Sequence, residues 1–233
     1  MSARNGWRGA VGSALVGILV VAIALGIGAA GWAQGENGKF APADVTSAGE
    51  IAYPMNAVQG GLVSLLVKLD ENGNAQDWHV QQDVPPLTAA AQAGVKKWTF
   101  QAAMVNGRNV AGYFPVHVVF NPYNPGGTAV MGGGPKVPPA VPSNLGHFLP
   151  PQVRRASYAI YPPATQAQGT VVLSVEISKA GHVGNIKVVR GVPVLNQAAI
   201  DAVKQWGFQP AMLDGETRAG RLCVAFVFQR NLS

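Results

Sequence analysis

The chain has 233 residues, a formal net charge of +6 and a single cysteine, Cys223. One cysteine excludes an intramolecular disulfide, so the fold must be stabilised by packing alone. The charge is uneven: residues 45–121 carry four basic and five acidic side chains, whereas residues 152–231 carry nine basic and four acidic ones. A basic second half suits acidic peptides, anionic polymers or a membrane surface. No nucleic-acid-binding motif is present, and we expect no nucleic-acid partner.

The first element in chain order is an apolar N-terminal segment. Residues 9–33 hold no charged side chain and follow a short basic lead that contains Arg4 and Arg8. This pattern is typical of an export signal or of a membrane anchor. Small residues precede Gln34, as a signal peptidase requires, while the segment is also long enough for a tilted span. Residues 1–33 are therefore either a signal peptide or a membrane anchor, and both place the remainder outside the cytoplasm.

The remainder of the chain contains an internal repeat with an offset of 108 residues and no gap. Many matched positions are glycine, proline or aromatic residues, which fix turns and cores. Examples are Tyr53-Pro54 with Tyr161-Pro162, Gly73 with Gly181, Trp98 with Trp206, and Phe120 with Phe228. A repeat of this length is a small domain and not a solenoid unit. We predict two tandem domains, copy one (residues 45–121) and copy two (residues 152–231), joined by a linker rich in proline and glycine (residues 122–151).

Each copy begins with the pattern of a β-hairpin. In copy two, apolar residues alternate over 170–177, which predicts a half-buried strand, and 183–189 predict the return strand. The counterpart in copy one covers 63–69. There Asn72-Gly73 supplies the positive φ angle that a tight hairpin turn needs.

A helix and a last strand complete each copy. Apolar residues over 195–206 line one helical face, with Asn196 at the N-cap and Thr88 as its counterpart in copy one. The last strand of copy two is Leu222–Gln229, which matches Phe114–Asn121. The predicted fold class is α+β. Each copy is expected to be β-β-α-β, a three-stranded antiparallel sheet with one helix packed on it.

The order of these elements and their fixed residues resembles the C-terminal domain of TonB-type energy transducers. Copy two matches that pattern at Tyr161-Pro162, Gly169-Thr170-Val171, Gly181, Leu195, Ala198-Ala199, Trp206-Gly207-Phe208-Gln209-Pro210-Ala211 and Val227-Phe228. Copy one resembles it less closely, because Ala102 replaces the proline of the Trp-Phe segment. The apolar N-terminal segment also lacks the histidine that transducer anchors carry.

The resemblance implies a binding module rather than an enzyme, with no cofactor. In that family an N-terminal anchor meets a proton-driven motor in the inner membrane, and the C-terminal domain pairs with an extended box segment of an outer-membrane receptor. Pairing uses the free edge of the last strand, which offers main-chain donors and acceptors. Pro115 within the last strand of copy one cannot donate, so copy two is the expected binding copy.

The expected partner-binding residues are therefore in the last strand of copy two, with basic residues nearby as possible charge contacts. The strand residues are Leu222, Cys223, Val224, Ala225, Phe226, Val227, Phe228 and Gln229. The charge contacts are Arg154, Arg155, Arg218, Arg221 and Arg230.

Catalytic and metal-binding patterns are missing from the sequence. It contains no GxSxG, HExxH or phosphate-loop motif, and the four histidines have no metal-ligand spacing. Two hypotheses remain. In the first, an exported, periplasmic TonB-like protein binds extended segments of envelope proteins and supports transport across the outer membrane, with motor proteins as further partners if residues 9–33 stay as an inner-membrane anchor. In the second, a soluble periplasmic scaffold reuses the fold without energy coupling.

Overall fold

The computed structural model describes five ranges of the chain: residues 39–57, 59–122, 134–141, 148–163 and 165–229. The predicted signal or anchor, residues 1–33, lies outside these ranges, as does Arg230. All described residues belong to one compact unit, Gly35–Ser233. Within them, no helix is both long and apolar enough to cross a bilayer.

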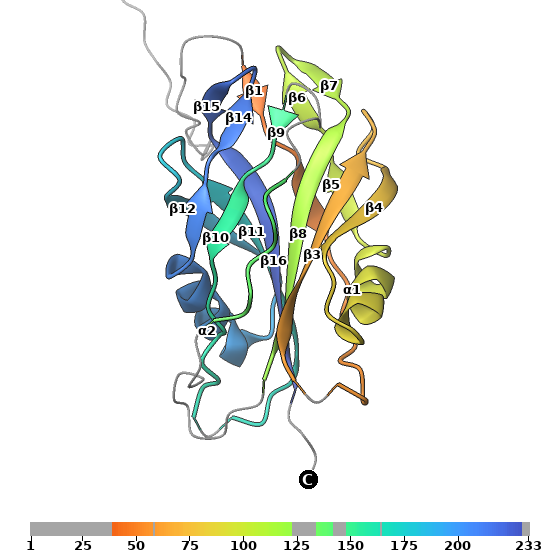
Figure 1. Cartoon of the computed structure of the whole chain (residues 1–233), viewed down its shortest axis with the longest axis vertical. Coiled ribbons are helices and arrows are strands. Elements are labelled where there is room, and N and C mark those ends of the chain that lie inside the picture. The colour runs from red at the N-terminus through yellow and green to blue at the C-terminus, as the bar shows by residue number, and fades with distance from the viewer. Residues whose placement is uncertain (1–38, 58, 123–133, 142–147, 164, 230–233) are drawn as a thin grey trace, which may run out of the picture. The chain divides into compact units, whose positions relative to one another are not determined.

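A six-stranded sheet in the order β12-β11-β16-β8-β3-β4 forms the centre of this unit (Figure 1). Copy one contributes β3 (Gly61–Leu69), β4 (Ala75–Gln82) and β8 (Gly112–Asn121). Copy two contributes β11 (Gly169–Ile177), β12 (Val183–Arg190) and β16 (Gly220–Phe228). The α+β class is thus confirmed, but the two expected three-stranded sheets are joined into one.

The joint between the copies is a parallel pairing of their last long strands, β16 and β8. The register runs from Cys223 opposite Val116 to Phe228 opposite Asn121. Equivalent residues of the repeat therefore lie almost level, and all other neighbours within the sheet are antiparallel. An approximate twofold axis along the strands relates the copies. Because this axis lies in the plane of the sheet, it exchanges the two faces: equivalent surfaces of the two copies lie on opposite faces of the sheet.

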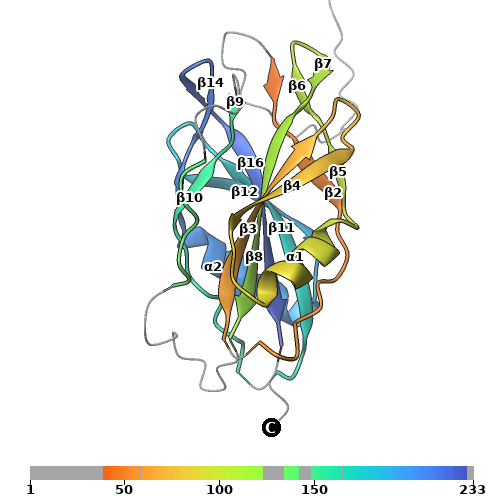
Figure 2. The same cartoon turned by 45° about the vertical axis from the view of Figure 1, so that its right-hand side comes forward.

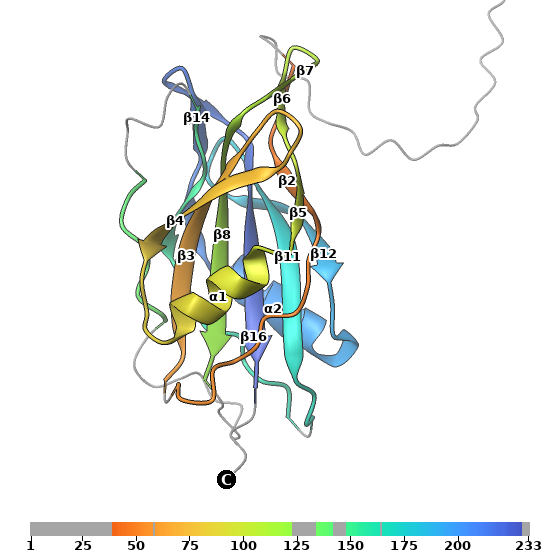
Figure 3. The ribbon, with the colours of Figure 1, turned by 90° about the vertical axis from the view of Figure 1, so that its right-hand side faces the viewer.

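The two helices consequently cover opposite faces of the sheet. α1 (Leu87–Val95) packs on β3, and α2 (Pro193–Lys204) packs on β11 and β12. Figure 1 shows the helices on either side of the strands, and Figure 3 shows α1 in front of them. Two apolar cores result, one under each helix.

Each core contains side chains from the other copy, because paired parallel residues point to the same face. Four residues of copy two belong to the core under α1: Val172, Cys223, Ala225 and Val227. Leu62 and Val119 of copy one belong to the core under α2. Neither core is complete without both copies.

The helices begin earlier than predicted. α2 starts at Pro193, a position where the fixed φ of proline suits the first turn and its missing N–H is not needed. Asn196, the predicted N-cap, lies within the first turn, and its Oδ1 accepts the N–H of Val192 at 2.9 Å. Thr88 acts in the same way in copy one, where its Oγ1 accepts the N–H of Val84 at 2.8 Å.

Short strands that the sequence did not predict surround the sheet. Copy one and its lead contain β1 (Phe40–Ala41), β2 (Asp44–Ser47), β5 (Thr99–Gln101), β6 (Ala103–Val105) and β7 (Arg108–Val110). The second set is β9 (Phe148–Leu149), β10 (Gln152–Arg155), β13 (Gly207–Gln209), β14 (Ala211–Leu213) and β15 (Glu216–Arg218). β9 falls inside the predicted linker. Figure 2 shows the hairpins β6–β7 and β14–β15 at the same end of the sheet.

The predicted hairpin turn of copy one is confirmed. Gly73 adopts φ +84°, a left-handed conformation that glycine enters at no steric cost, and its N–H donates to the carbonyl of Asp70 at 3.1 Å. A Cβ atom at Gly73 would lie 2.5 Å from the carbonyl oxygen of Phe100. Both the backbone conformation and the close approach therefore require glycine.

Candidate functional site

The strand predicted to bind a partner lies inside the sheet. Leu222–Phe228 are part of β16, and Gln229 follows it. β11 pairs with one side of β16, and β8 pairs with the other. The expectation of a free edge at Leu222–Gln229 is wrong, because copy one occupies that edge. A partner strand can pair there only if β8 leaves.

The side chains of β16 are also core side chains. Leu222, Val224, Phe226 and Phe228 pack under α2, whereas Cys223, Ala225 and Val227 pack under α1. All seven are almost fully buried. Opening the joint between β16 and β8 would therefore expose apolar surface from both cores.

Pro115 does not leave β8 unpaired, contrary to the sequence expectation of a poor pairing strand. Pro115 lies opposite Leu66 in β3, and the ladder between β8 and β16 begins at the next residue, Val116. The N–H that proline lacks is therefore not needed by that ladder. Pro115 lies just outside the pairing between β8 and β16, which explains why proline is compatible with a strand inside the sheet.

Cys223 is a buried thiol. It lies opposite Val116 in β8 and Ser174 in β11. Burial, and to a smaller degree the nearby negative charge of Asp44, raise the pKa of the Cys223 thiol well above its usual value. A thiol held protonated and covered by neighbouring strands is a poor nucleophile.

The basic residues predicted as charge contacts are mostly engaged within the chain. Arg221 Nη1 lies 2.7 Å from Asp44 Oδ2, and Arg221 Nη2 lies 3.5 Å from Glu176 Oε2. Arg218 pairs with Glu216 at 2.6 Å. The two arginines of β10 donate within copy two: Arg154 to the side chain of Gln209 and Arg155 to the carbonyl of Gln205. The Arg221 side chain is only 16% exposed.

A segment at the start of each copy forms hydrogen bonds with the other copy. In the N-terminal strap, residues 44–51, Asp44 Oδ1 accepts from Ser174 Oγ at 2.5 Å, and the N–H of Ile51 donates to Thr170 Oγ1 at 3.0 Å. The equivalent segment of copy two, residues 152–159, bonds to copy one: Asn121 Nδ2 donates to the carbonyl of Ala159 at 2.7 Å. Sequence reasoning missed this strap, because no local pattern links Asp44 to a serine 130 residues away.

A buried histidine, His117, lies on the face of copy one that α1 does not cover. His117 Nδ1 is 3.1 Å from Ser64 Oγ, which in turn is 3.2 Å from Gln81 Oε1. His117 Nε2 has no hydrogen-bond partner among the described residues. Burial lowers the pKa of His117 to about 4. The imidazole is therefore neutral near pH 7.

The two free edges of the sheet are β12 and β4, and they differ in charge. Val188 on β12 and Val80 on β4 are equivalent in the repeat and are 38% and 40% exposed. Lys187 next to Val188 is exposed, and its equivalent is His79, which contacts Asp77 at 3.3 Å. β12 is thus a basic edge and β4 is not. Among the described residues no group of three or more potential metal ligands occurs.

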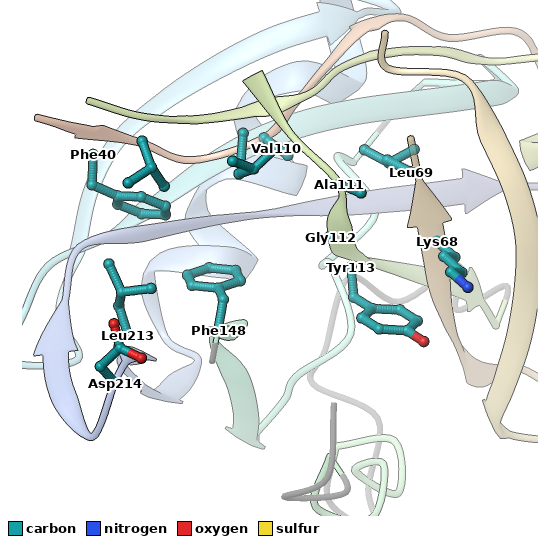
Figure 4. A pocket seen from close by; sticks show the side chains of 13 residues that line it. Phe40, Lys68, Leu69, Val110, Ala111, Gly112, Tyr113, Phe148, Leu213 and Asp214 are labelled. Atoms are coloured by element: carbon teal, nitrogen blue, oxygen red, sulfur yellow. The ribbon is translucent and has the colours of Figure 1, made fainter. Parts of the chain in front are cut away.

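A cavity of about 510 Å³ opens between the hairpins at one end of the sheet (Figure 4). Its walls are mostly apolar, and the rings of Phe40 and Phe148 lie 5.2 Å apart beside it. Lys68 and Asp214 are its charged lining residues. Nothing in the sequence pattern predicted a cavity here, since its walls come from both copies.

The fold defines the chain as a tandem repeat of two small α+β domains, which share one sheet through their last strands. The family described as Gram-negative bacterial TonB protein C-terminal matches residues 49–122 and 158–229, and the chain belongs to this family. The resemblance noted in the sequence is thereby confirmed in both copies.

Two curated relatives carry the name Protein TonB, from Xanthomonas campestris pv. campestris strains B100 and ATCC 33913. Each is 36% identical to this chain over 76 residues, which cover 30% of this chain and 34% of the relative. The chain thus matches about a third of the length of these relatives. No solved structure matches it significantly.

Proposed function

We propose that this chain is a periplasmic envelope protein of the TonB energy-transducer type that binds extended segments of other envelope proteins by β-strand addition. Membership of the family in both copies supports the transducer type. One observation carries the binding mode: the outer strand β12 has a neighbour on one side only. Its other side offers main-chain groups to an incoming strand.

β12 is a better receiving edge than β4 for a segment with acidic side chains. Both edges have a regular central part, Ile186 to Val188 opposite β11 and Asp77 to Val80 opposite β3, so their side chains distinguish them. The exposed ammonium of Lys187 and the exposed side chain of Val188 offer one charge contact and one apolar contact. Basic residues exceed acidic ones by nine to four in copy two, and this excess draws acidic segments to it.

The proposed partners follow from the family. An outer-membrane receptor segment, or an equivalent stretch of another envelope protein, supplies the incoming strand. If residues 9–33 stay in the inner membrane, motor proteins there supply the energy.

A titration with a synthetic ten-residue peptide of threonine, valine and glutamate tests the binding mode. Amide hydrogen exchange is measured by NMR on the full chain. We expect exchange to slow at residues 184–190, because new main-chain hydrogen bonds form there. Protection that appears only at 222–229 would instead mean that β8 separates and the peptide pairs with β16. A peptide that protects no amide would contradict strand addition altogether.

A matched pair of variants tests the charge contact. Lys187→Glu places a negative charge on β12, and His79→Glu places the same charge at the equivalent position of β4. Reversal of an exposed charge is expected to weaken binding of the acidic peptide by about three- to tenfold. His79→Glu should leave the dissociation constant unchanged. Equal effects of the two changes would contradict binding at β12.

A scaffold without energy coupling is the second candidate, and one observation favours it. The last strand of copy two, through which the family receives its box, is paired with β8. Mass spectrometry of the mature N-terminus separates the candidates. A chain that starts at Gln34 has no helix of its own to reach the motor, whereas retention of Arg4 and Arg8 supports coupling.

A further inference from the structure

The two copies differ in side-chain chemistry at the end of the sheet that carries the hairpins β6–β7 and β14–β15. On the copy-one side lies the cavity of about 510 Å³ described above. No residue of β12 lines it, so what it binds does not depend on strand addition at that edge. Its volume is in the range of small-molecule sites in proteins, which span roughly 300–1,000 Å³.

The repeat explains why this space is open on one side. Val110 and Tyr113 line the cavity, and their equivalents in copy two are Arg218 and Arg221. Those arginine side chains are 17% and 16% exposed and form ion pairs within the fold. The equivalent of Lys68 is Glu176, which contacts Arg221. Copy two thus has ion-paired side chains at these positions, whereas copy one has an apolar space and one cation there.

The cavity has an apolar body and a cationic end. Figure 4 shows Lys68 and Tyr113 toward one end, and Phe40, Phe148 and Leu213 toward the other. Lys68 and Tyr113 are register partners on neighbouring strands, so their side chains emerge on the same face. Among the described residues Lys68 has no ion pair, although Asp77 lies opposite it in β4. Asp214 lies at the far end, near Leu213.

We propose that this cavity binds a single-chain anionic amphiphile such as a long fatty acid. The carboxylate lies at the Lys68 ammonium with the Tyr113 hydroxyl as a second donor, and the hydrocarbon chain runs toward Phe148 and Leu213. Each buried methylene strengthens binding about fourfold, so the apolar walls select a long chain. Asp214 repels a second anionic group at the far end, so the site selects a ligand with one head.

Photo-crosslinking on the full chain in lipid nanodiscs tests the location. The probe is hexadecanoic acid with a diazirine on its chain, and mass spectrometry maps the labelled residues. We expect label on β1, β9 and β14. Label spread over the protein, or found only at residues 9–33, would overturn the proposal.

A matched pair of variants tests whether the cavity itself holds the probe. Val110→Arg restores the residue of copy two and fills the space, so labelling at β9 and β14 should fall about tenfold. Val194→Arg places the same charge on an exposed residue of α2 and should change nothing. Equal labelling in Val110→Arg and in the unchanged chain would contradict the site.

A second variant tests the head group without filling the cavity. Lys68→Glu, which copies Glu176, should weaken binding of hexadecanoic acid about tenfold through loss of a charge-assisted contact. It should leave binding of the uncharged analogue hexadecanol unchanged. Loss of both ligands, or of neither, would contradict a carboxylate at Lys68. The buried thiol of Cys223 should stay unreactive in every folded variant, which provides a control for folding.

Discussion

At the scale of single residues, Asp44 connects three parts of the chain that are far apart in sequence. Its carboxylate accepts from Ser174 and pairs with Arg221, while Arg221 also reaches Glu176. The Asp44 side chain is 12% exposed, so the pair is only weakly screened by solvent. Removing one member leaves the other charge partly buried and incompletely paired.

Asp44→Ala should therefore lower the free energy of unfolding by about 3 kcal/mol, at the lower end for a broken buried pair, since Glu176 still contacts Arg221. Urea denaturation followed by circular dichroism measures the change. Glu216→Ala is the control, because Glu216 pairs with Arg218 but is 66% exposed. The control should cost less than about 1 kcal/mol. Equal losses in both variants would contradict the role of burial.

His117 makes stability depend on pH. Its pKa is about 4 in the folded chain, because burial disfavours the charged imidazole, and near 6.5 when unfolded. Between these values the unfolded chain binds a proton that the folded chain does not. The contribution of His117 to the free energy of unfolding should therefore be complete above pH 6.5. The free energy should fall by about 3 kcal/mol as the pH falls to 4.

His117→Gln tests this by removing the titrating group while keeping a polar side chain near Ser64. We expect a flatter dependence of the urea midpoint on pH between 5 and 7, a window in which ordinary carboxylates change little. His182→Gln is the control, because His182 is exposed. An unchanged slope in His117→Gln would show that another group carries the dependence.

At the scale of elements, the first turns of the two helices have the same side-chain hydrogen bond, because they are equivalent in the repeat. Thr88 and Asn196 occupy equivalent positions and accept from the equivalent amides of Val84 and Val192. Thr88→Ala and Asn196→Ala should each lower the free energy of unfolding by about 1 kcal/mol. Gln197→Ala, on the exposed side of α2, should cost less in the same denaturation measurement.

How much of each element the sequence predicts depends on the range of the interactions that form it. Alternation over 63–69 and 170–177 located β3 and β11, but the prediction that such a strand is half-buried is wrong, because both strands lie inside the joined sheet and are buried on both faces. The N-caps were misplaced by two residues in α1 and by four in α2, since Asn196 resembles a cap but acts from inside the first turn. β9 and β14 were missed because two- and three-residue strands leave no periodic signal.

The site escaped prediction for a different reason. A sequence with β-β-α-β repeats specifies a last strand with one open side, yet it does not state which strand takes that side. Here Val116–Asn121 of copy one does. One cue was available: Val224, Phe226 and Phe228 alternate with Cys223, Ala225 and Val227, so both faces of β16 are apolar. Such a strand is buried on both sides and is a poor candidate for an exposed edge.

At the scale of the whole molecule, shared cores predict a single unfolding transition for the described unit. Val119 belongs to copy one but packs under α2 with the core of copy two. Val119→Ala should destabilise the unit by about 1–3 kcal/mol, the range for truncated core residues, and shift both copies together.

Tryptophan fluorescence can check this, because Trp98 lies in the core of copy one and Trp206 in that of copy two. In variants that keep one of these tryptophans as the only one in the described part, urea transitions should coincide before and after Val119→Ala. Separate midpoints would show that the copies unfold independently despite the joint between β8 and β16.

The joint between β8 and β16 also has a consequence for concentration. Two separate chains that paired in this way would fall apart on dilution, because their association is bimolecular. Here both strands belong to one polypeptide, and covalent linkage keeps such partners at an effective concentration of the order of millimolar. The paired state is therefore set by the chain itself and not by its copy number, so a few molecules per cell are as fully assembled as many.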